Sequence, residues 1–417
     1  MSSDTTLAMA PPKDPVWRTA LSGAQILFVA FGATVLVPLL TGLNPSLALL
    51  GAGIGTLVFQ ICTKREVPIY LGSSFAFIAP VIYSVQTWGM PATFGALASA
   101  SFFYYVAAGL VKWRGVGFIH RLLPPVVIGP VVMVIGLGLA QVAVSMATGK
   151  AGDQQIMPYG TALTVATISL AATMLTAIRA RRILKLVPIL VGVAVGYAYS
   201  LFIGIVDFSK VTNAAWIAIP EFGKPEFNMA AILFMIPVAI APIVEHVGGI
   251  LAIGSVTGKD FTESPGLHRT LLGDGLAVNI VGLFGGPPVT TYGEVTGAVM
   301  LTKNYNPVVM TWAAVFAILM AFVGKFGAFL QTIPMPVMGG IMMLLFGSIA
   351  GIGLKTIMDG RVDLASPRNL CIVSVTLVTG IGGLGVTIGS FSLQGISLCG
   401  VLAVLLNLVL PREPAAA

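Results

Sequence analysis

The chain has 417 residues, of which 57% are hydrophobic and 9% are charged, whereas a soluble domain carries roughly 25% charged residues. This composition excludes an ordinary soluble enzyme or binding domain and indicates a protein with many membrane-spanning helices. The net charge of +7 is scattered in small groups between apolar runs, so it indicates a membrane face and no nucleic-acid partner.

Fourteen apolar segments follow one another along the chain. Each is judged against the roughly 20 residues that a helix needs to cross a bilayer core. In chain order they cover 17–41, 45–62, 67–84, 91–111, 123–146, 158–178, 183–206, 229–254, 266–284, 288–302, 307–330, 333–353, 369–389 and 391–411. We therefore predict an all-α polytopic membrane protein. Residues 1–15 form a polar tail without the apolar core of a cleaved signal, and this tail is expected in the cytoplasm.

The basic residues support this count. With both termini in the cytoplasm, eighteen of the 22 Lys and Arg residues lie on the cytoplasmic side, as the positive-inside rule requires. The four exceptions are Lys150, Lys210, Lys224 and Lys325. Removing one segment would move every later loop to the other side and spoil this bias, so we expect a multi-pass membrane protein with both termini in the cytoplasm.

The third and tenth segments differ from the rest. "VPIYLGSSFAFIAPVIYSV" (67–85) and "PPVTTYGEVTGAVMLTK" (287–303) each pass from a proline through β-favouring residues and glycine before a helix becomes plausible. Interrupted segments at matching positions in two halves point to a midplane transport site. The halves would be 16–206 and 229–411, related as inverted repeats of seven spans and joined by an extracytoplasmic connector, 207–228.

Extended backbone inside a membrane is tolerable only where its polar groups find partners away from lipid. We predict that "YLGS" and "TTYG" pair as short strands, each followed by a half-helix. The half-helices would start near Ser74–Phe75 and Gly293–Glu294, with their unpaired N–H groups facing a common cavity. The alternative is that both stretches are loops or kinked helices, with glycine present for close packing.

Three acidic residues lie inside the predicted spans, where an ionised carboxylate costs about 2.5–3.5 kcal/mol. Glu245, in "MIPVAIAPIVEHVGGILAIG", is favoured as a functional group, although it and His246 alternatively satisfy each other or bridge helices. His246 is expected to hydrogen-bond a neighbouring backbone, and a proton relay is the weaker reading. Glu294 suits ligand binding or helix capping. Asp274 is either functional or a polar support that bonds a half-helix end.

Other chemistry is not indicated. Cys62, Cys371 and Cys399 lack metal-ligand spacing, and no phosphate-binding loop or paired nucleophile and base appears. We expect no enzyme activity, no metal and no cofactor. Phe75, Phe77 and Tyr292 flank the half-helices and could contact a flat ligand.

Six stretches together resemble the nucleobase–ascorbate transporter family, also called the second nucleobase–cation symporter family, and within it the bacterial uracil–proton symporters. They are "FGATVLVPLL", "PIYLGSSFAFIAP", "VEHVGG", "PGLHRTLL", "TTYGEVTGAVMLTK" and "IPMPVMGGIMMLLFG". The resemblance implies the fourteen-span inverted-repeat fold, with a core domain (spans 1–4 and 8–11) and a gate domain (spans 5–7 and 12–14). It also suggests a homodimer.

The resemblance implies site roles as well. The residue matching Glu245 accepts from the nucleobase and takes part in proton coupling, and the residue matching Glu294 accepts a ring N–H. Backbone amides matching Phe75 and Gly293 donate to ring carbonyls. Ala33, Phe75 and Tyr292 match pocket-lining positions, and Phe346 stands where the uracil symporters have a tyrosine.

Three further departures are Ile26, Gly249 and Val295, which replace two histidines and an asparagine of the family patterns. From the resemblance we expect proton-coupled import of a nucleobase, most directly uracil or a related pyrimidine. The alternatives are a purine or xanthine symporter of the same family, an anion transporter of the same architecture, and a passive channel or sensor.

Overall fold

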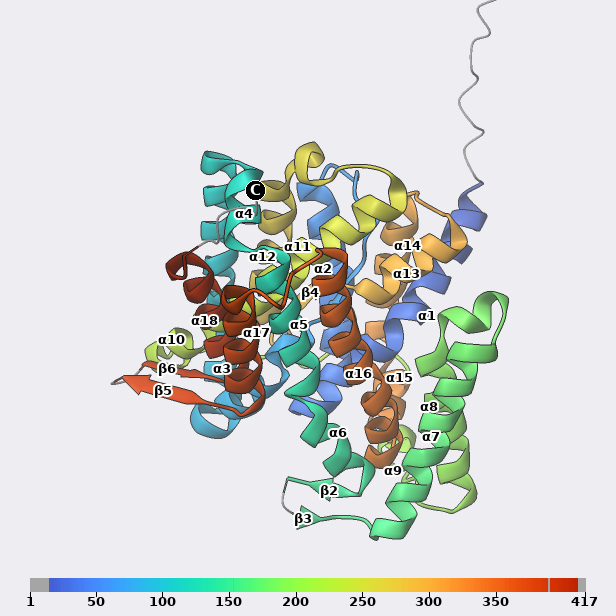
Figure 1. Cartoon of the computed structure of the whole chain (residues 1–417). Helices are drawn as coiled ribbons and strands as arrows, with labels where there is room; N and C mark the ends of the chain where they lie inside the picture. Colours follow the sequence, from blue (N-terminus) through green and yellow to red (C-terminus); the bar gives the residue numbers. More distant parts are fainter. Residues whose placement is uncertain (1–14, 153, 389–390, 412–417) are drawn as a thin grey trace, which may run out of the picture.

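The structure, a computed structural model, describes residues 15–152, 154–388 and 391–411, so nearly all of the predicted tail 1–15 lies outside it. The described chain is mostly helical (Figure 1). Seven of its helices are long and apolar enough to cross a membrane, and four more are apolar but shorter. A membrane protein with many helical spans is thus confirmed, whereas the count of fourteen crossings stays a prediction.

The predicted pairing of two short strands is confirmed. β1 (Leu71–Ser73) pairs antiparallel with β4 (Val289–Thr291), and Gly72 lies opposite Thr290. All residues of both strands are buried. Each strand therefore satisfies the backbone polar groups of the other inside the helical bundle, as the membrane interior requires.

A helix starts directly after each of these strands. The first begins as the single turn η1 (Phe75–Phe77) and continues into α3 (Ile78–Arg114). The second is α13 (Gly293–Thr302). Within α3 the backbone breaks at Gly89, where φ is +83°, ahead of Pro91. This break falls between the predicted third and fourth spans, because proline cannot continue the hydrogen-bond ladder of the preceding helix.

The helices pack in two groups. The first group contacts the β1–β4 ribbon or one another and comprises α1 (Val16–Thr41), α2 (Pro45–Cys62), α3, α10 (Met229–Val238), α11 (Ile240–Thr257), α12 (Leu267–Leu283), α13 and α14 (Val308–Ala321). The second group packs on α5 and α16. It comprises α5 (Pro125–Leu137), α6 (Ala140–Ala147), α7 (Tyr159–Arg179), α8 (Pro188–Phe202), α16 (Met335–Asp359), α17 (Pro367–Ile381) and α18 (Gly395–Val409). The groups meet where α1 contacts α8 and α11 contacts α5 and α18. Their assignment as core and gate domains stays a prediction.

Three predicted spans are divided in the structure. The fifth becomes α5 and α6, the eighth becomes α10 and α11, and the eleventh becomes α14 and α15 (Gly324–Leu330). In the eighth, the division lies at Ala239, between Pro237 and Pro242. Neither proline has an N–H to donate, so the ladder is weakened on both sides of Ala239. The predicted seventh span, 183–206, contributes only α8, preceded by the turn η2 (Arg182–Leu186).

The last two predicted spans, 369–389 and 391–411, were wrong at their junction. The chain there forms an antiparallel pair, β5 (Gly385–Ile388) with β6 (Phe391–Gln394), instead of helix. α17 ends at Ile381, Gly383 follows with positive φ, and Gly395, also with positive φ, begins α18. Between them Val386, Thr387 and Ile388 are β-branched, and such residues favour strands. The segment is apolar enough to be predicted as part of a membrane-spanning helix, but its glycines interrupt the helix.

Short elements complete the chain. They are α4 (Val116–Leu122), β2 (Lys150–Ala151), β3 (Gln154–Gln155), α9 (Ser209–Asn213) and the irregular turn η3 (Thr262–Gly266). In Figure 1 the start of α1 and α4 lie at the upper end of the bundle, whereas α9, β2 and β3 lie at the lower end. The segment that follows α9 pairs with the α14–α15 junction through a bridge between Ile217 and Val323.

Candidate functional site

Glu245 lies on α11, just after the division of the predicted eighth span. Val244 and His246 beside it are buried, but Glu245 itself keeps some exposed surface. Its Oε2 atom has no hydrogen-bond partner among the described residues. A carboxylate oxygen held in a mostly apolar helix without a partner is costly unless a ligand or a proton satisfies it.

Glu294 lies in the first turn of α13, where the helix dipole stabilises a negative charge. Like Glu245, it is partly exposed; Gly293 before it is exposed and Val295 after it is buried. α13 packs against α11, and the two carboxylates are close enough to repel each other. The structure therefore brings together the two acidic residues that the sequence singled out most strongly.

Open space adjoins these carboxylates. Gly293, which precedes Glu294, is exposed, and a Cβ atom built on it would meet no heavy atom within 4 Å. The same holds for Gly248, one turn beyond Glu245. No protein atom therefore occupies the space immediately beside these two glycines.

Both helix starts leave backbone donors uncapped. Ser74 precedes η1 and Tyr292 precedes α13, and neither caps its helix with a side-chain hydrogen bond. The hydroxyl of Ser74 is buried without a partner among the described residues. Because the first N–H groups of a helix have no intrahelical acceptor, the amides of Phe75 and Gly293 remain as donors at the start of each helix.

Tyr292 is buried and fixed by the strands. Its backbone N–H donates to the carbonyl of Tyr70, and its hydroxyl donates to the carbonyl of Ser73 at 2.9 Å. A Cβ atom on Gly72 would lie 2.4 Å from the Tyr292 ring, so the ring rests directly on the Gly72 backbone. Tyr292 therefore connects β1 to the start of α13.

The other predicted lining residues lie in the same region. Ala33 is fully buried on α1. Phe75 of η1 and Phe346 of α16 meet edge to face, with ring centroids 6.0 Å apart. Edge-to-face pairs of this kind are favourable beyond simple burial. This pair joins the two helix groups beside the start of η1.

The side-chain partners of His246 correct the prediction of a backbone hydrogen bond. Its Nε2 atom lies 3.0 Å from the hydroxyl of Thr270, and its Nδ1 atom lies 3.3 Å from Oδ2 of Asp274. Thr270 and Asp274 are both on α12, one turn apart. The sequence does not show which helices pack against each other, so the contact of His246 on α11 with α12 could not be predicted.

Asp274 connects three elements. It contacts His246 on α11, and its Oδ2 accepts from the hydroxyl of Thr290 on β4 at 3.5 Å. The expectation that Asp274 bonds a half-helix end is close to this, since Thr290 lies three residues before α13 begins. Asp274 thus sits behind the site, where it supports α11 and the ribbon.

Sequence reasoning missed Thr56 and Gly72. The hydroxyl of Thr56 on α2 accepts from the N–H of Leu71 at 2.9 Å, which ties the ribbon to α2. A glycine inside a strand often marks close approach of another group, so Gly72 carried a usable signal. Thr56 carried none, because a threonine in an apolar helix usually bonds its own helix.

Among the described residues, no group of three or more His, Cys, Asp or Glu side chains could hold a metal ion. The site is built from carboxylates, helix-start amides and aromatic rings. Such groups bind an uncharged ligand that both donates and accepts hydrogen bonds.

Comparison with known proteins agrees with the resemblance. A sequence profile described as "Permease family" matches residues 18–389. A "Probable uracil permease" of Pasteurella multocida is 57% identical over 395 residues, covering 95% of this chain and 94% of the relative. The "Uracil permease" of Bacillus caldolyticus is 48% identical, covering 94% and 92%, and that of Escherichia coli K12 is 40% identical, covering 95% and 92%.

Solved structures share the fold at low identity. The transmembrane domain of a cyanobacterium bicarbonate transporter, BicA, matches with a TM-score of 0.63 and 14% identity, covering 94% of this chain and 96% of that one. Murine solute carrier 26 family member A9, an anion transporter, matches with a TM-score of 0.70 and 14% identity, covering 97% and 69%. These likenesses show the architecture alone. The profile and the three relatives establish that the chain belongs to the permease family known as the nucleobase–ascorbate transporters, close to its uracil permeases.

Proposed function

We propose that the protein imports a nucleobase, most directly uracil or a related pyrimidine, together with protons. The observation that carries this proposal is the meeting of Glu245 and Glu294 beside two uncapped helix starts. The relatives that bear the name uracil permease point to the same substrate.

The chemistry of uracil complements this arrangement. The rim of the ring alternates N–H donors with carbonyl acceptors. The carboxylates of Glu245 and Glu294 would accept from the ring N–H groups, and the amides of Phe75 and Gly293 would donate to the ring carbonyls. An analogue without one of these groups would leave a buried partner unpaired, and such losses discriminate strongly.

Coupling to protons follows from the cost of moving charge through a low-dielectric region. Proton uptake at Glu245, together with the bound base, would remove the unpaired negative charge from the site. The neutral site could then move past the gate domain, by an elevator-like or rocking movement of the core domain. His246 and Asp274 would hold α11 and the ribbon in place while Glu245 gains or loses its proton.

The proposed setting is the bacterial inner membrane, with both termini in the cytoplasm and fourteen spans in two inverted halves. The antiparallel pairing of β1 with β4 supports inversion, because strands that run in opposite directions deliver their following helices in opposite directions. We further propose a homodimer formed through the gate domain.

Transport of an inorganic anion is the main alternative, since the structural neighbours named above include a bicarbonate transporter. Two carboxylates at the helix starts oppose it, because they would repel an anion by Coulomb forces. A purine or xanthine substrate would fit the same hydrogen-bonding groups. Competition of these bases with labelled uracil distinguishes it from a pyrimidine substrate.

The test is uptake of labelled uracil by purified protein in proteoliposomes under an imposed pH gradient, acid on the outside. We expect accumulation that collapses with a protonophore, and competition by pyrimidine bases that exceeds competition by xanthine or bicarbonate. Glu294→Gln should lower the apparent affinity, whereas Glu226→Gln, a change of an exposed loop glutamate, should leave it unaltered. Competition by bicarbonate alone, or uptake that is indifferent to every nucleobase, would contradict the proposal.

A further inference from the structure

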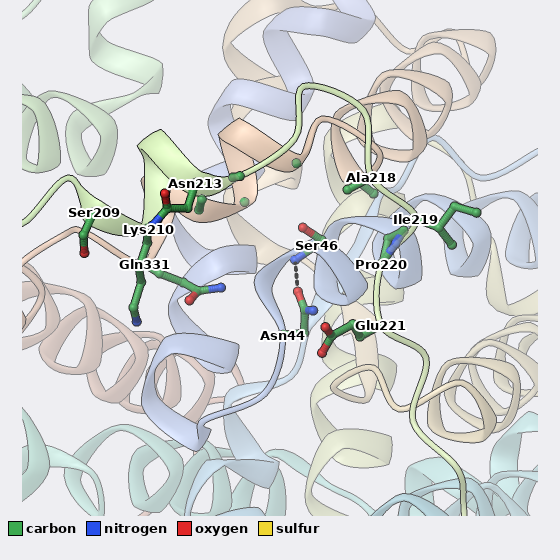
Figure 2. A pocket seen from close by; sticks show the side chains of 15 residues that line it. Asn44, Ser46, Ser209, Lys210, Asn213, Ala218, Ile219, Pro220, Glu221 and Gln331 are labelled. Atoms are coloured by element: carbon green, nitrogen blue, oxygen red, sulfur yellow. Dashed lines mark hydrogen bonds between the residues drawn. The ribbon is translucent and has the colours of Figure 1, made fainter.

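A polar cavity lies at the end of the bundle that carries α9, away from the paired glutamates. Its volume is about 590 Å³, and Figure 2 shows the side chains that line it. Its walls come from the α1–α2 turn, from α9 and the segment that follows it, and from α14, α15 and the turn after α15. Its lining includes Asn44, Lys210, Asn213, Pro220, Glu221 and Gln331.

The cavity is rich in groups that both donate and accept hydrogen bonds. Asn44, Asn213 and Gln331 are carboxamides, and Figure 2 shows the Gln331 amide directed toward the Asn44 side of the cavity. Asn44 accepts from the N–H of Ser46 through Oδ1, so its amide NH₂ remains a donor. Ser209 is already engaged, because both its N–H and its hydroxyl donate to Asp207.

The charges of the lining compensate each other. Lys210 is its cation and Glu221 is its anion, whereas Pro220, Ala321 and Ala328 add small apolar surfaces. An anion would meet the Glu221 carboxylate, and a cation would meet Lys210. The lining is therefore matched to a neutral, flat molecule with hydrogen-bonding edges, the same chemistry that suits the site at Glu245 and Glu294.

The wall formed by the α9 segment is firmly attached. Lys325 on α15 donates from Nζ to the carbonyl of Val211 at 2.9 Å. The N–H of Ala218 donates to the carbonyl of Phe322 at 3.0 Å, and the N–H of Gly324 donates to the carbonyl of Trp216 at 3.1 Å. Because these hydrogen bonds involve Val211, Trp216 and Ala218, the wall is attached to α15 and to the α14–α15 junction along its length.

The cavity lies at the C-terminal end of α1, the helix that carries Ala33. A second cavity of about 390 Å³ shares Asn44, Lys210 and Gln331 with it and reaches Pro38 and Leu39, inside α1. Along α1, Thr41 is about 12 Å from Ala33 at 1.5 Å per residue, and along α16, Met335 is about 17 Å from Phe346. Both distances are close to half of a bilayer core of about 30 Å. The cavity thus opens at the ends of the helices that carry two predicted pocket residues.

We infer that this cavity is a first binding site, which takes a neutral nucleobase from the α9 side before the base reaches Glu245 and Glu294. The inference rests on the proposed function and adds an earlier binding step to it. Holding the base here raises its local concentration over the entry, which speeds capture without changing the energetics of proton coupling.

The experiment uses membrane vesicles of both orientations containing the full chain, with initial rates of labelled uracil uptake. The double variant Asn213→Ala/Gln331→Ala removes two carboxamides. The matched control is Gln154→Ala, an exposed carboxamide on β3 at the same end of the bundle. We expect the double variant to raise KM by about fivefold for each hydrogen bond lost, in one vesicle orientation only. The maximal rate and the accumulation ratio should match those of wild type.

The outcomes separate the inference from the function on which it rests. A KM equal to that of wild type, or raised equally in both orientations, overturns the first binding site and leaves the proposed transport intact. Wild-type vesicles that take up no nucleobase overturn both. A thermal unfolding midpoint equal to that of Gln154→Ala shows that the double variant is folded, so that a changed KM reports capture.

Discussion

Two antiparallel strand pairs of this protein differ in almost every respect except their hydrogen bonding. The β1–β4 ribbon joins Leu71 with Thr291, far apart in the chain, and all its residues are buried. The β5–β6 pair is local, and Gly385, Val386 and Thr387 are exposed. A strand pair in the centre of a membrane bundle must satisfy every backbone group and fit its neighbours closely, whereas an exposed strand segment such as 385–387 is less constrained.

Gly72→Ala tests how closely the buried ribbon fits its neighbours, and it should have the largest effect. The added Cβ atom would lie 2.4 Å from the Tyr292 ring, which is held in place by its hydrogen bond to Ser73. Overpacking of this kind costs about 1–3 kcal/mol, so we expect a lower thermal unfolding midpoint and a severe loss of uptake. Gly109→Ala, on α3, is the control, because no atom lies within 4 Å of its Cβ position. Equal stability of the two variants would show that the ribbon accommodates the added methyl group, and would contradict the close fit of Gly72 against Tyr292.

A smaller effect is expected from Tyr292→Phe. The ring and its packing remain, but the buried carbonyl of Ser73 loses the hydroxyl that donates to it at 2.9 Å. Leaving a buried acceptor unpaired costs about 1–3 kcal/mol, and we expect this variant to fold, with reduced stability and weaker uracil binding. Tyr305→Phe, at a residue 42% exposed, provides the comparison in equilibrium binding and thermal unfolding. Unchanged binding would mean that the hydroxyl does not position the start of α13.

The smallest effect belongs to the exposed pair. Val386→Ala removes two methyl groups from a side chain that is 42% exposed. Surface substitutions usually change stability by less than about 0.5 kcal/mol, so thermal unfolding and uptake should both resemble wild type. A loss as large as that of Gly72→Ala would show that the β5–β6 pair has a structural role comparable to that of the central ribbon.

The central ribbon was predictable because the membrane restricts what an interrupted segment can do. Pro68 and Pro288, followed by β-favouring residues and glycine, left paired strands as the arrangement that satisfies the backbone. The exposed pair was not predicted, because Val386 and Ile388 made the segment apolar enough to be read as part of a span. Hydropathy averages over a window and is insensitive to a glycine that ends a helix.

The candidate site was predictable to a similar, limited extent. Glu245, Glu294 and the two helix starts could be found in sequence, because acidic residues and glycine breaks are conspicuous among apolar spans. The contacts that the site's side chains make could not be predicted from the sequence. The contact of His246 with Thr270 and Asp274 depends on how α11 and α12 pack, and the placement of the Tyr292 ring depends on Gly72 of a distant strand.

The most direct test of the account is the steady accumulation of uracil by Glu245→Gln in proteoliposomes under an inward proton gradient. Glutamine keeps the size of the side chain and cannot exchange a proton. We predict that this variant equilibrates uracil at most, while Glu226→Gln concentrates it as wild type does. Accumulation by Glu245→Gln above the external concentration would contradict the assignment of Glu245 as the group that couples proton and base.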